Sequence, residues 1–283
     1  MLTQELQSKY QALQRMIADA GPAVVAFSGG VDSTLLLRVA RDVLGPDRVL
    51  AATATSPSFP AHERNEAAEL AQSLGVRHAV LATDEMNNSQ FVSNSPQRCY
   101  FCKQELFTRL RTLAEQAGLR AVLEASNADD ESDYRPGLKA VRELGVRSPL
   151  REARLSKADV RALSRELGLP THDKPSFACL ASRIPYGEPI TEEKLRRIEK
   201  AEDLLRELGF RQFRVRRHGL LARIELGAHE DGSALLRGET RNRLVKELKA
   251  LGYRYVALDL EGYRTGSMNE VLSARGRNAR PAT

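Results

Sequence analysis

The chain has 283 residues, of which 42% are hydrophobic and 28% are charged, a composition typical of a globular protein. At roughly 100–200 residues per domain, this length predicts two domains. No apolar run approaches the roughly 18 residues that a membrane-spanning helix needs, and residues 1–10 do not resemble an export signal. We therefore expect a cytoplasmic protein that does not cross a membrane.

The chain contains three cysteines and carries a formal net charge of +6. Three cysteines cannot all pair with one another, which favours a reducing compartment where they act as thiols or metal ligands. The positive charge favours anionic ligands such as nucleotides, phosphorylated metabolites or nucleic acid. Aromatic residues make up only 5% of the chain and tryptophan is absent, so the stacking platforms of single-stranded nucleic-acid binders are missing. No nucleic-acid partner is expected.

From residue 23 onward, short apolar runs alternate with longer segments of helical period. This alternation predicts an α/β fold, a parallel twisted sheet with helices on both faces. The expected strands cover residues 23–27, 49–54, 78–81 and 121–125. The expected helices cover residues 33–44, 61–74, 104–117 and 157–167, after an amphipathic helix that begins within the first ten residues.

Between residues 169 and 192, prolines and a glycine interrupt both the helical and the strand pattern of apolar residues, which is typical of a functional loop. The elements expected after it predict a smaller α+β domain: helices over 192–208 and 240–251, and strands over 213–216, 221–226 and 255–258. The predicted organisation is an α/β domain over 1–170, a loop carrying Cys179 over 171–190, an α+β domain over 191–270, and a disordered tail over 271–283.

The first expected strand runs directly into Ser28-Gly29-Gly30-Val31-Asp32-Ser33 and then into a helix. Adjacent glycines let the backbone approach phosphate oxygens, and the helix N-terminus adds N–H donors and a positive dipole. Ser28 and Ser33 can add hydroxyl donors, whereas Asp32 is expected to bind Mg²⁺ or clamp the backbone. The run is neither a Walker loop nor a dinucleotide fingerprint. A strand-to-helix turn without a ligand is the alternative.

This run resembles the PP-loop of the ATP pyrophosphatases, which include the ammonia-using synthetases for NAD and GMP and the tRNA thiolation enzymes. The resemblance implies that ATP is cleaved between its α and β phosphates, that AMP moves to a substrate oxygen, and that pyrophosphate leaves. It also implies ATP contacts from the whole loop and from Thr53, Ser56 and Asn127, and a possible Mg²⁺ ligand at Asp130. For Asp129 and Asp130 the alternative is an ordinary solvated turn.

Cys99 and Cys102 have C-x-x-C spacing, and Cys179 lies in the irregular loop. Three thiolates can hold a [4Fe–4S] cluster at three corners and leave one iron open. With His172 they could instead form a Cys₃His zinc site, and a redox pair or three thiols without a special role are further alternatives. Positively charged residues on both sides of Cys179 favour its nucleophilic thiolate form.

Together, the phosphate loop and the thiols resemble the LarE family, ATP-dependent sulfur transferases that help to make the nickel-pincer nucleotide cofactor of lactate racemase. The matching segments span nearly the whole chain: 28–33, 98–103, 127–140, 179–187, 214–216 and 259–270. The implied substrate is pyridinium-3,5-biscarboxylic acid mononucleotide or its monothiocarboxylate. The implied reaction adenylates a carboxylate of this substrate and converts it to a thiocarboxylate.

In the LarE family the sulfur comes from the protein's own cysteine, which is left as dehydroalanine, or from a three-cysteine [4Fe–4S] cluster that carries an extra sulfide. The position that matches the sacrificial cysteine is Cys179. Because Cys99 and Cys102 accompany it, the count of ligands favours the cluster.

The resemblance also implies that Ser182, Arg183, Arg214 and Arg216 bind the phosphate of the substrate near the thiol. Arg214 and Arg216 lie two residues apart in an expected strand, so both project from the same face. A solvent-facing edge strand would show the same alternation and is the alternative.

The family is further expected to form homo-oligomers, such as hexamers, through a C-terminal domain that also binds the substrate. Three other functions stay open from the sequence. They are thiolation of tRNA by the same adenylation chemistry, an amide-forming ATP pyrophosphatase, and a nucleotide-binding regulator without turnover.

Overall fold

The computed structural model describes residues 2–131, 135–176 and 178–272. Two compact units are formed, each from two stretches of chain: Met1–Glu85 with Gln97–Phe177, and Met86–Pro96 with Ala178–Thr283. The expected disordered tail lies almost entirely outside the described residues, as do Asp133 and Tyr134 of the matching segment 127–140. None of the helices described in these ranges is long and apolar enough to cross a membrane.

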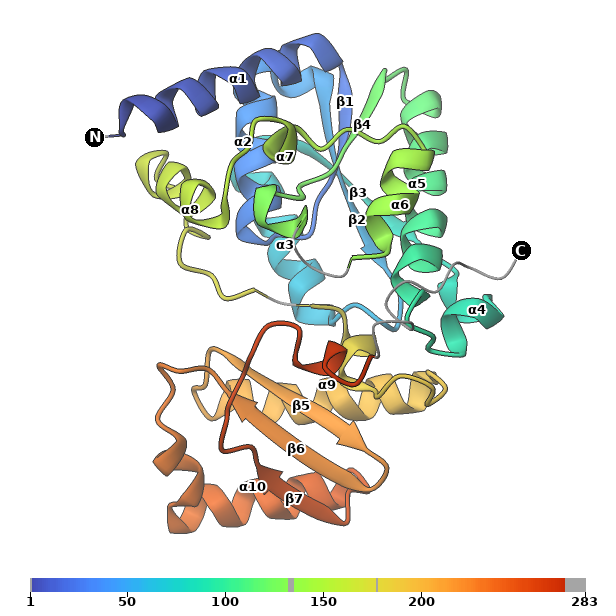
Figure 1. The fold of residues 1–283 in the computed structure, drawn as a ribbon, viewed down its shortest axis with the longest axis vertical. Helices are drawn as coiled ribbons and strands as arrows, with labels where there is room; N and C mark the ends of the chain where they lie inside the picture. The colour runs from blue at the N-terminus through green and yellow to red at the C-terminus, as the bar shows by residue number, and fades with distance from the viewer. Residues whose placement is uncertain (1, 132–134, 177, 273–283) are drawn as a thin grey trace. The chain divides into compact units, whose positions relative to one another are not determined.

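A four-stranded parallel sheet forms the centre of the first unit, with the strand order β3-β2-β1-β4 (Figure 1). The strands are β1 (Ala23–Ala26), β2 (Val49–Thr55), β3 (Arg77–Ala82) and β4 (Ala121–Leu123). The chain adds β2 and then β3 on one side of β1 and returns to place β4 on its other side. Ligands of open parallel sheets bind at such a switch point, beyond the carboxyl ends of the strands.

Helices cover both faces of this sheet, as the sequence predicts (Figure 1). One core contains Ala23 and Val25 of β1, and the other contains Val24, because successive strand residues point to opposite faces. The first core includes residues of α1 (Gln4–Ala20), α2 (Val31–Leu44), α3 (Ala61–Ser73) and α8 (Lys157–Glu166). The second includes residues of α5 (Arg98–Gln116) and α6 (Gly137–Glu143).

Two helices of the first unit begin earlier than the sequence predicts. Helix α2 begins at Val31 rather than residue 33, and α5 begins at Arg98 rather than residue 104. Neither N-cap, Gly30 or Gln97, caps its helix with a side-chain hydrogen bond, so the usual sequence signal of a helix start is absent. The short helices α4 (Ser89–Val92), α6 and α7 (Pro149–Glu152) were also not predicted.

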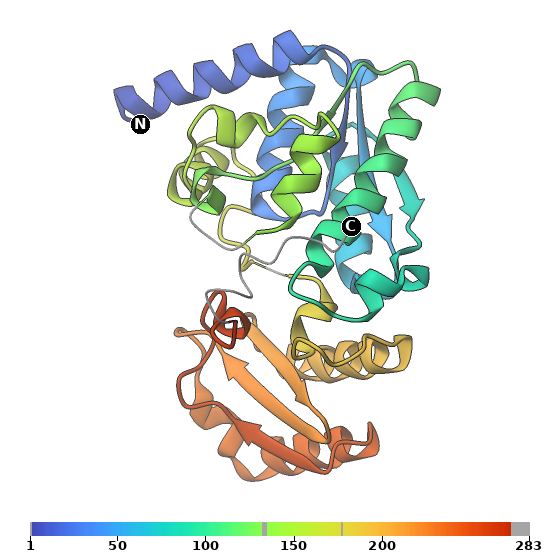
Figure 2. The ribbon, with the colours of Figure 1, turned by 45° about the vertical axis from the view of Figure 1, so that its right-hand side comes forward.

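The second unit is built on a three-stranded mixed sheet, whose strands lie side by side in the order β5-β6-β7 (Figure 2). Strand β5 (Phe213–His218) is antiparallel to β6 (Leu221–Leu226), which is parallel to β7 (Tyr255–Leu258). Helices α9 (Glu192–Glu207) and α10 (Gly238–Ala250) contribute to its core. This smaller α+β unit completes the predicted fold class.

The early segment Met86–Pro96 belongs to the second unit, and Asn94 explains how it is held there. Asn94 is fully buried and has a φ of 55°, a conformation that asparagine tolerates better than most residues. Its Nδ2 donates to the carbonyl oxygens of Ile184, Pro185 and Glu188 at 3.3, 2.7 and 3.0 Å. The two N–H hydrogens of this amide are therefore shared among three converging carbonyl oxygens.

Candidate active site

The phosphate loop connects β1 to α2 and turns sharply at Gly29. Gly29 has a φ of 68°, and a Cβ at this position would lie 3.2 Å from the Cα of Ala67. Only glycine therefore fits without strain. Gly30 is the N-cap of α2, so the first N–H groups of a 14-residue helix lie directly after the loop.

The two serines of the loop bond to each other and to its backbone. Their Oγ atoms lie 3.1 Å apart, and the Ser33 hydroxyl donates to the carbonyl oxygen of Gly30 at 3.2 Å. The backbone N–H of Gly30 in turn donates to the Ser28 hydroxyl at 3.4 Å. These hydrogen bonds stabilise the turn of the loop. We call the pair of serine hydroxyls the Ser28–Ser33 clamp.

Both carboxylate oxygens of Asp32 accept bonds from side chains far away in the sequence. Asn127 Nδ2 donates to Asp32 Oδ1 at 3.0 Å, and Lys157 Nζ donates to Asp32 Oδ2 at 2.5 Å. The structure thus brings together Asp32 and Asn127, both of which were predicted to contribute to the ATP site. Lys157 was not predicted as a site residue; it directly follows Ser156, the N-cap of α8.

The turn after β4 is fixed by its own side chains. The backbone N–H of Asn127 donates to Asp130 Oδ2 and that of Asp129 to Asn127 Oδ1, both at 3.0 Å. Asp130 is buried and its other oxygen pairs with Arg135 Nη2 at 2.9 Å, so the alternative of a solvated turn is wrong for this residue. Asp129 is exposed, and its Oδ2 accepts the backbone N–H of Lys157 at 2.9 Å.

Negative charge accumulates beyond the ends of β1 and β4. Burial raises the pKa of Asp130, and the carboxylates of Asp32 and Glu124 raise it further, although Arg135 opposes them. Glu124 is itself buried and lies 3.5 Å from Lys103 Nζ. These carboxylates therefore disfavour one another's ionisation.

The expected adenine contacts Thr53 and Ser56 lie at the end of β2. The Thr53 hydroxyl donates to the carbonyl oxygen of Phe27 at 2.7 Å and lies 2.8 Å from His78 Nε2. Because the Thr53 proton is already used, His78 Nε2 must be the donor, which defines the ring as the Nε2–H tautomer. Ser56 Oγ lies 2.9 Å from Ser58 Oγ.

Lys174 links the irregular segment to the phosphate loop within the first unit. Its Nζ donates to the carbonyl oxygen of Gly29 at 3.2 Å and pairs with Glu63 and Glu66 at 2.9 and 2.7 Å. Burial would lower the pKa of Lys174, but the two carboxylates outweigh burial and raise it. The ammonium therefore stays charged and holds residues 170–176 against the loop.

The three cysteines are half-buried, form no disulfide among the described residues, and lie in two different units. Cys99 and Cys102 lie three residues apart at the start of α5, so their side chains share one face of the helix. Cys179 belongs to the second unit, just before a short 3₁₀ helix over Leu180–Arg183. Among the described residues, no group of three or more His, Cys, Asp or Glu side chains could hold a metal ion.

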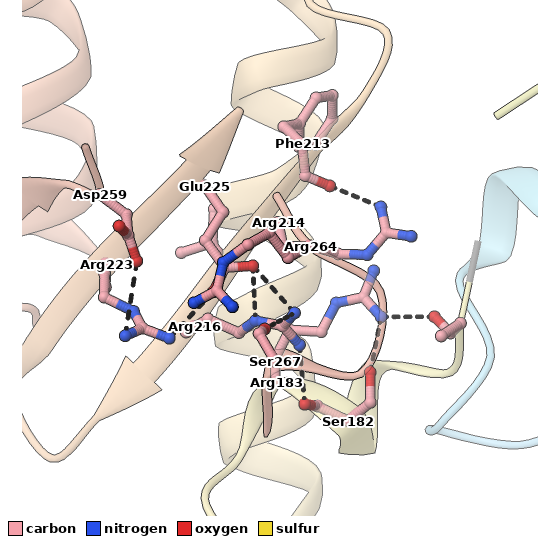
Figure 3. A network of polar contacts seen from close by, with 12 residues as sticks. Ser182, Arg183, Phe213, Arg214, Arg216, Arg223, Glu225, Asp259, Arg264 and Ser267 are labelled. Atoms are coloured by element: carbon pink, nitrogen blue, oxygen red, sulfur yellow. Dashed lines mark hydrogen bonds and ion pairs between the residues drawn. The ribbon is translucent and has the colours of Figure 1, made fainter. Parts of the chain in front are cut away.

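Arg183 holds the backbone beside Cys179. Its guanidinium is fully buried and pairs with both oxygens of Glu202, at 2.9 and 3.0 Å. Its Nη1 donates to the carbonyl oxygens of Ala178 and Cys179 and to the hydroxyl of Ser182, at 2.6, 3.0 and 2.9 Å (Figure 3). Bidentate pairing of this kind fixes the orientation of the guanidinium, and with it the loop that carries the thiol.

Arg214 and Arg216 lie on β5 and are buried, so the alternative of a solvent-facing strand is wrong. Arg216 Nη1 donates to the carbonyl oxygen of Ser182 at 3.0 Å, and its Nη2 pairs with Glu225 at 2.9 Å (Figure 3). Burial and the charge of Arg183 lower the pKa of Arg214 to about 10. The Arg214 guanidinium also lies over the Tyr263 ring, 4.6 Å from its centre.

The parallel sheet and the glycine turn at its switch point define the first unit as a PP-loop ATP pyrophosphatase domain. In agreement, residues 5–133 match the family model of NAD synthase. The chain is 31% identical over 226 residues to the tRNA-specific 2-thiouridylase of Xanthobacter autotrophicus, covering 65% of this chain and 57% of that protein.

Two further relatives match nearly the whole chain. The pyridinium-3,5-bisthiocarboxylic acid mononucleotide synthase of Lactiplantibacillus plantarum is 42% identical over 268 residues, which are 95% of this chain and 96% of that protein. An uncharacterized protein of Synechocystis is 47% identical over 95% of this chain and 99% of its own length. The chain therefore belongs to the LarE family, which confirms the resemblance seen in its motifs.

Proposed function

We propose that this protein is an ATP-dependent sulfurtransferase of nickel-pincer cofactor synthesis. Its substrate would be pyridinium-3,5-biscarboxylic acid mononucleotide or its monothiocarboxylate. The observation that carries the proposal is the arrangement around Cys179. Arg183 donates to the backbone carbonyl oxygen of Cys179, and Arg216 donates to that of Ser182, so the backbone of the loop that carries the thiol is bound by buried cations of a kind suited to a mononucleotide phosphate.

In the first half-reaction, a substrate carboxylate oxygen attacks the α-phosphorus of ATP. A bond from this oxygen to phosphorus forms, the bond to the β-phosphate oxygen breaks, and pyrophosphate leaves. The turn at Gly29 and the N-terminus of α2 stabilise the phosphates, and the Ser28–Ser33 clamp keeps the turn in shape. Asp32 and Asp130 would hold Mg²⁺, which neutralises phosphate charge when bound.

In the second half-reaction, the Cys179 thiolate attacks the acyl carbon of the adenylate and AMP leaves with the electron pair of the broken C–O bond. Transfer of the Cα proton of Cys179 to a solvent base then forms the Cα=Cβ double bond and breaks the Cβ–Sγ bond, whose electron pair stays on the sulfur of the thiocarboxylate. The products are a thiocarboxylate and a dehydroalanine at position 179. Ser182 and Arg183 hold the loop, while Arg214 and Arg216 bind the substrate phosphate.

The count of thiols favours a second sulfur source, a [4Fe–4S] cluster held by Cys99, Cys102 and Cys179. The first two thiols fit this role because they are half-buried and share one face of α5. When bound, such a cluster would supply a sulfide in place of the cysteine sulfur. The Cys₃His alternative has His172 Nδ1 3.1 Å from the carbonyl oxygen of Leu169, which leaves Nε2 for a metal.

Anaerobic purification followed by iron, sulfide and zinc analysis tests the sulfur source. About four irons per chain, lost in Cys99→Ala, would establish the cluster. Metal-free protein that releases pyrophosphate and loses the mass of one sulfur at Cys179 would establish the sacrificial cysteine.

Two substitutions test the two half-reactions separately. We expect Asp32→Ala to abolish AMP transfer, whereas Cys179→Ala should retain AMP transfer and lose sulfur delivery. Thiocarboxylate formation by Cys179→Ala would falsify the mechanism.

Similarity to the tRNA 2-thiouridylase supports tRNA thiolation as a second candidate. Binding of tRNA would weaken steeply with salt, because neutralised phosphates release counterions, whereas binding of a mononucleotide would depend on salt only slightly. The division into domains 1–170, 171–190 and 191–270, the cytoplasmic location and assembly into a homo-oligomer stay predictions.

A further inference from the structure

The N-termini of two helices meet at the Asp32–Lys157 ion pair. Asp32 is the second residue of the 14-residue helix α2, and Lys157 is the first residue of the 10-residue helix α8. A lysine is disfavoured in the first turn of a helix, because the helix dipole places positive charge there. The 2.5 Å contact between Lys157 Nζ and Asp32 Oδ2 offsets this repulsion.

The backbone at Lys157 is anchored to the turn that follows β4. Its N–H donates to Asp129 Oδ2 at 2.9 Å, and the N–H of Ala128 donates to the carbonyl oxygen of Leu155 at 2.8 Å. Helix α8 is fixed at the same end by a capping box between Ser156 and Asp159. The start of α8 is therefore held in place relative to the phosphate loop.

The charges around the loop favour a cationic side chain at this point in addition to the proposed Mg²⁺. The phosphates of a nucleotide would bind at the start of α2, where the carboxylate of Asp32 alone would repel them. An ammonium group has three N–H donors, and Asp32 Oδ2 takes one of them. The Lys157 side chain is 29% exposed, so its ammonium can be reached by an anion from solvent.

We propose that Lys157 is a further catalytic residue of the adenylation step, which binds the β and γ phosphates of ATP and the leaving pyrophosphate. In the described structure its ammonium group pairs with Asp32. The inference rests on the proposed ATP pyrophosphatase chemistry. Negative charge on the leaving group grows as the bond to the α-phosphorus breaks, so the ammonium stabilises the transition state more than it stabilises bound ATP.

Inorganic pyrophosphate is the probe for binding, measured by calorimetry without divalent cations. We expect Lys157→Met to weaken pyrophosphate binding about tenfold or more, and Lys157→Arg to retain part of the affinity. Asp32→Asn should strengthen binding under these conditions, because it removes a repulsive carboxylate and releases Lys157. The matched control is Lys9→Met, since Lys9 pairs at 3.0 Å with Asp159 of the same helix and should leave affinity unchanged.

Pyrophosphate release from ATP with magnesium gives the second readout. Lys157→Met should lower kcat about tenfold or more while changing the KM for ATP much less, as expected for a transition-state contact. A melting temperature for each variant, together with Lys157→Gln, separates this effect from unfolding.

The two levels of inference fail in different ways. If the wild-type protein binds pyrophosphate and Lys157→Met and Lys157→Gln bind it equally well with unchanged kcat, Lys157 only joins two helices and the inference is wrong. If the wild-type protein neither binds pyrophosphate nor releases it from ATP, the proposed chemistry itself is wrong.

Discussion

Single buried charges hold the loop that carries Cys179. Burial would raise the pKa of Glu202, but the Arg183 guanidinium outweighs burial and holds it below its usual range. Glu202 is thus ionised in the folded protein, and it also accepts the backbone N–H of Val215 at 3.0 Å. One carboxylate therefore connects α9 to both the loop and β5.

Replacement of this carboxylate should be costly. Glu202→Gln leaves the buried Arg183 charge without its counterion, so we expect the free energy of unfolding to fall by about 3–5 kcal/mol. Urea denaturation measures the change. In the control, Glu207→Gln breaks a pair with Arg243 in which the side chains are 62% and 52% exposed, and it should cost at most about 1 kcal/mol. Equal losses in the two variants would contradict this account.

His78 makes stability depend on pH. Burial lowers its pKa from 6.5, because the neutral ring that donates to Thr53 loses less hydration than the charged ring would. A depressed pKa gives stability that is complete above about pH 6.5 and is lost as the pH falls through the folded-state value. The melting temperature of His78→Gln should therefore fall less than that of the wild type between pH 7.5 and pH 5.5.

An exposed histidine provides the comparison for this measurement. His229→Gln should follow the wild-type pH profile, because the ring of His229 lies in solvent. If His78→Gln had the same profile as the wild type, burial of His78 would not be the cause of the pH dependence.

Whether a residue of the candidate site could be predicted depends on how far away in the sequence its contact partners lie. Asp32 and the loop glycines could be predicted because the local run of residues specifies their chemistry. Lys157 could not, since it is 125 residues away from the carboxylate that it contacts. The burial of Arg214 and Arg216 could not be predicted either. Alternation along β5 shows that the two side chains lie on one face of the strand, but it does not show whether other residues cover that face.

The local periodicity of apolar residues was sufficient to predict the main helices and strands. Strands β6 and β7 have the predicted bounds, and the ends of most helices differ by one residue from the prediction. The start of α5 was not predictable because the side chain of its N-cap, Gln97, makes no capping bond to the first turn. As a result, Cys99 and Cys102 lie on a helix rather than in a loop.

Helix α6 packs closely against the cysteine-bearing start of α5 at Gly137. A Cβ at this position would lie 2.7 Å from Lys103 Cδ and 3.2 Å from the carbonyl oxygen of Cys99. Gly137→Ala should therefore push the two helices apart and lower the free energy of unfolding by about 1–3 kcal/mol. Urea denaturation measures the loss, and thiol-labelling rates at Cys99 and Cys102 report the displacement.

Gly238→Ala is the matched control for this substitution. Gly238 begins α10, and a Cβ there would have no atom within 4 Å. Alanine favours the helix over glycine, so this variant should be as stable as the wild type or up to about 1 kcal/mol more stable. A loss at both positions would show that crowding at Gly137 is not the cause.

For the whole molecule, the fold class could be predicted from the order of the strands and helices. Which stretches of chain form each unit could not be predicted. Met86–Pro96 joins the second unit through hydrogen bonds to residues about 90 positions later. No local pattern in a polar, asparagine-rich segment specifies such distant carbonyl partners. The sequence therefore predicts two domains that follow one another, whereas the chain passes between its units three times.

Asn94 should control the stability of the second unit alone. Asn94→Ala leaves the carbonyls of Ile184, Pro185 and Glu188 without their shared donor, so we expect a loss of about 1–3 kcal/mol. Hydrogen exchange followed by mass spectrometry should show faster exchange over residues 184–190 and an unchanged β1–β2 pair. Asn88→Ala, which removes the N-cap of α4, should affect only residues near that helix. Faster exchange throughout both sheets of Asn94→Ala would contradict this view.

The interrupted second unit also has a consequence for synthesis on the ribosome. The segment with Asn94 and the buried Phe91 emerges about 90 residues before the carbonyls that it binds. At about 5–20 residues per second, it waits roughly 5–20 s without its partners. During this delay the segment cannot make the three hydrogen bonds of Asn94 that hold it in the second unit. We therefore expect this segment to reach its native position only after residue 188 has been synthesised.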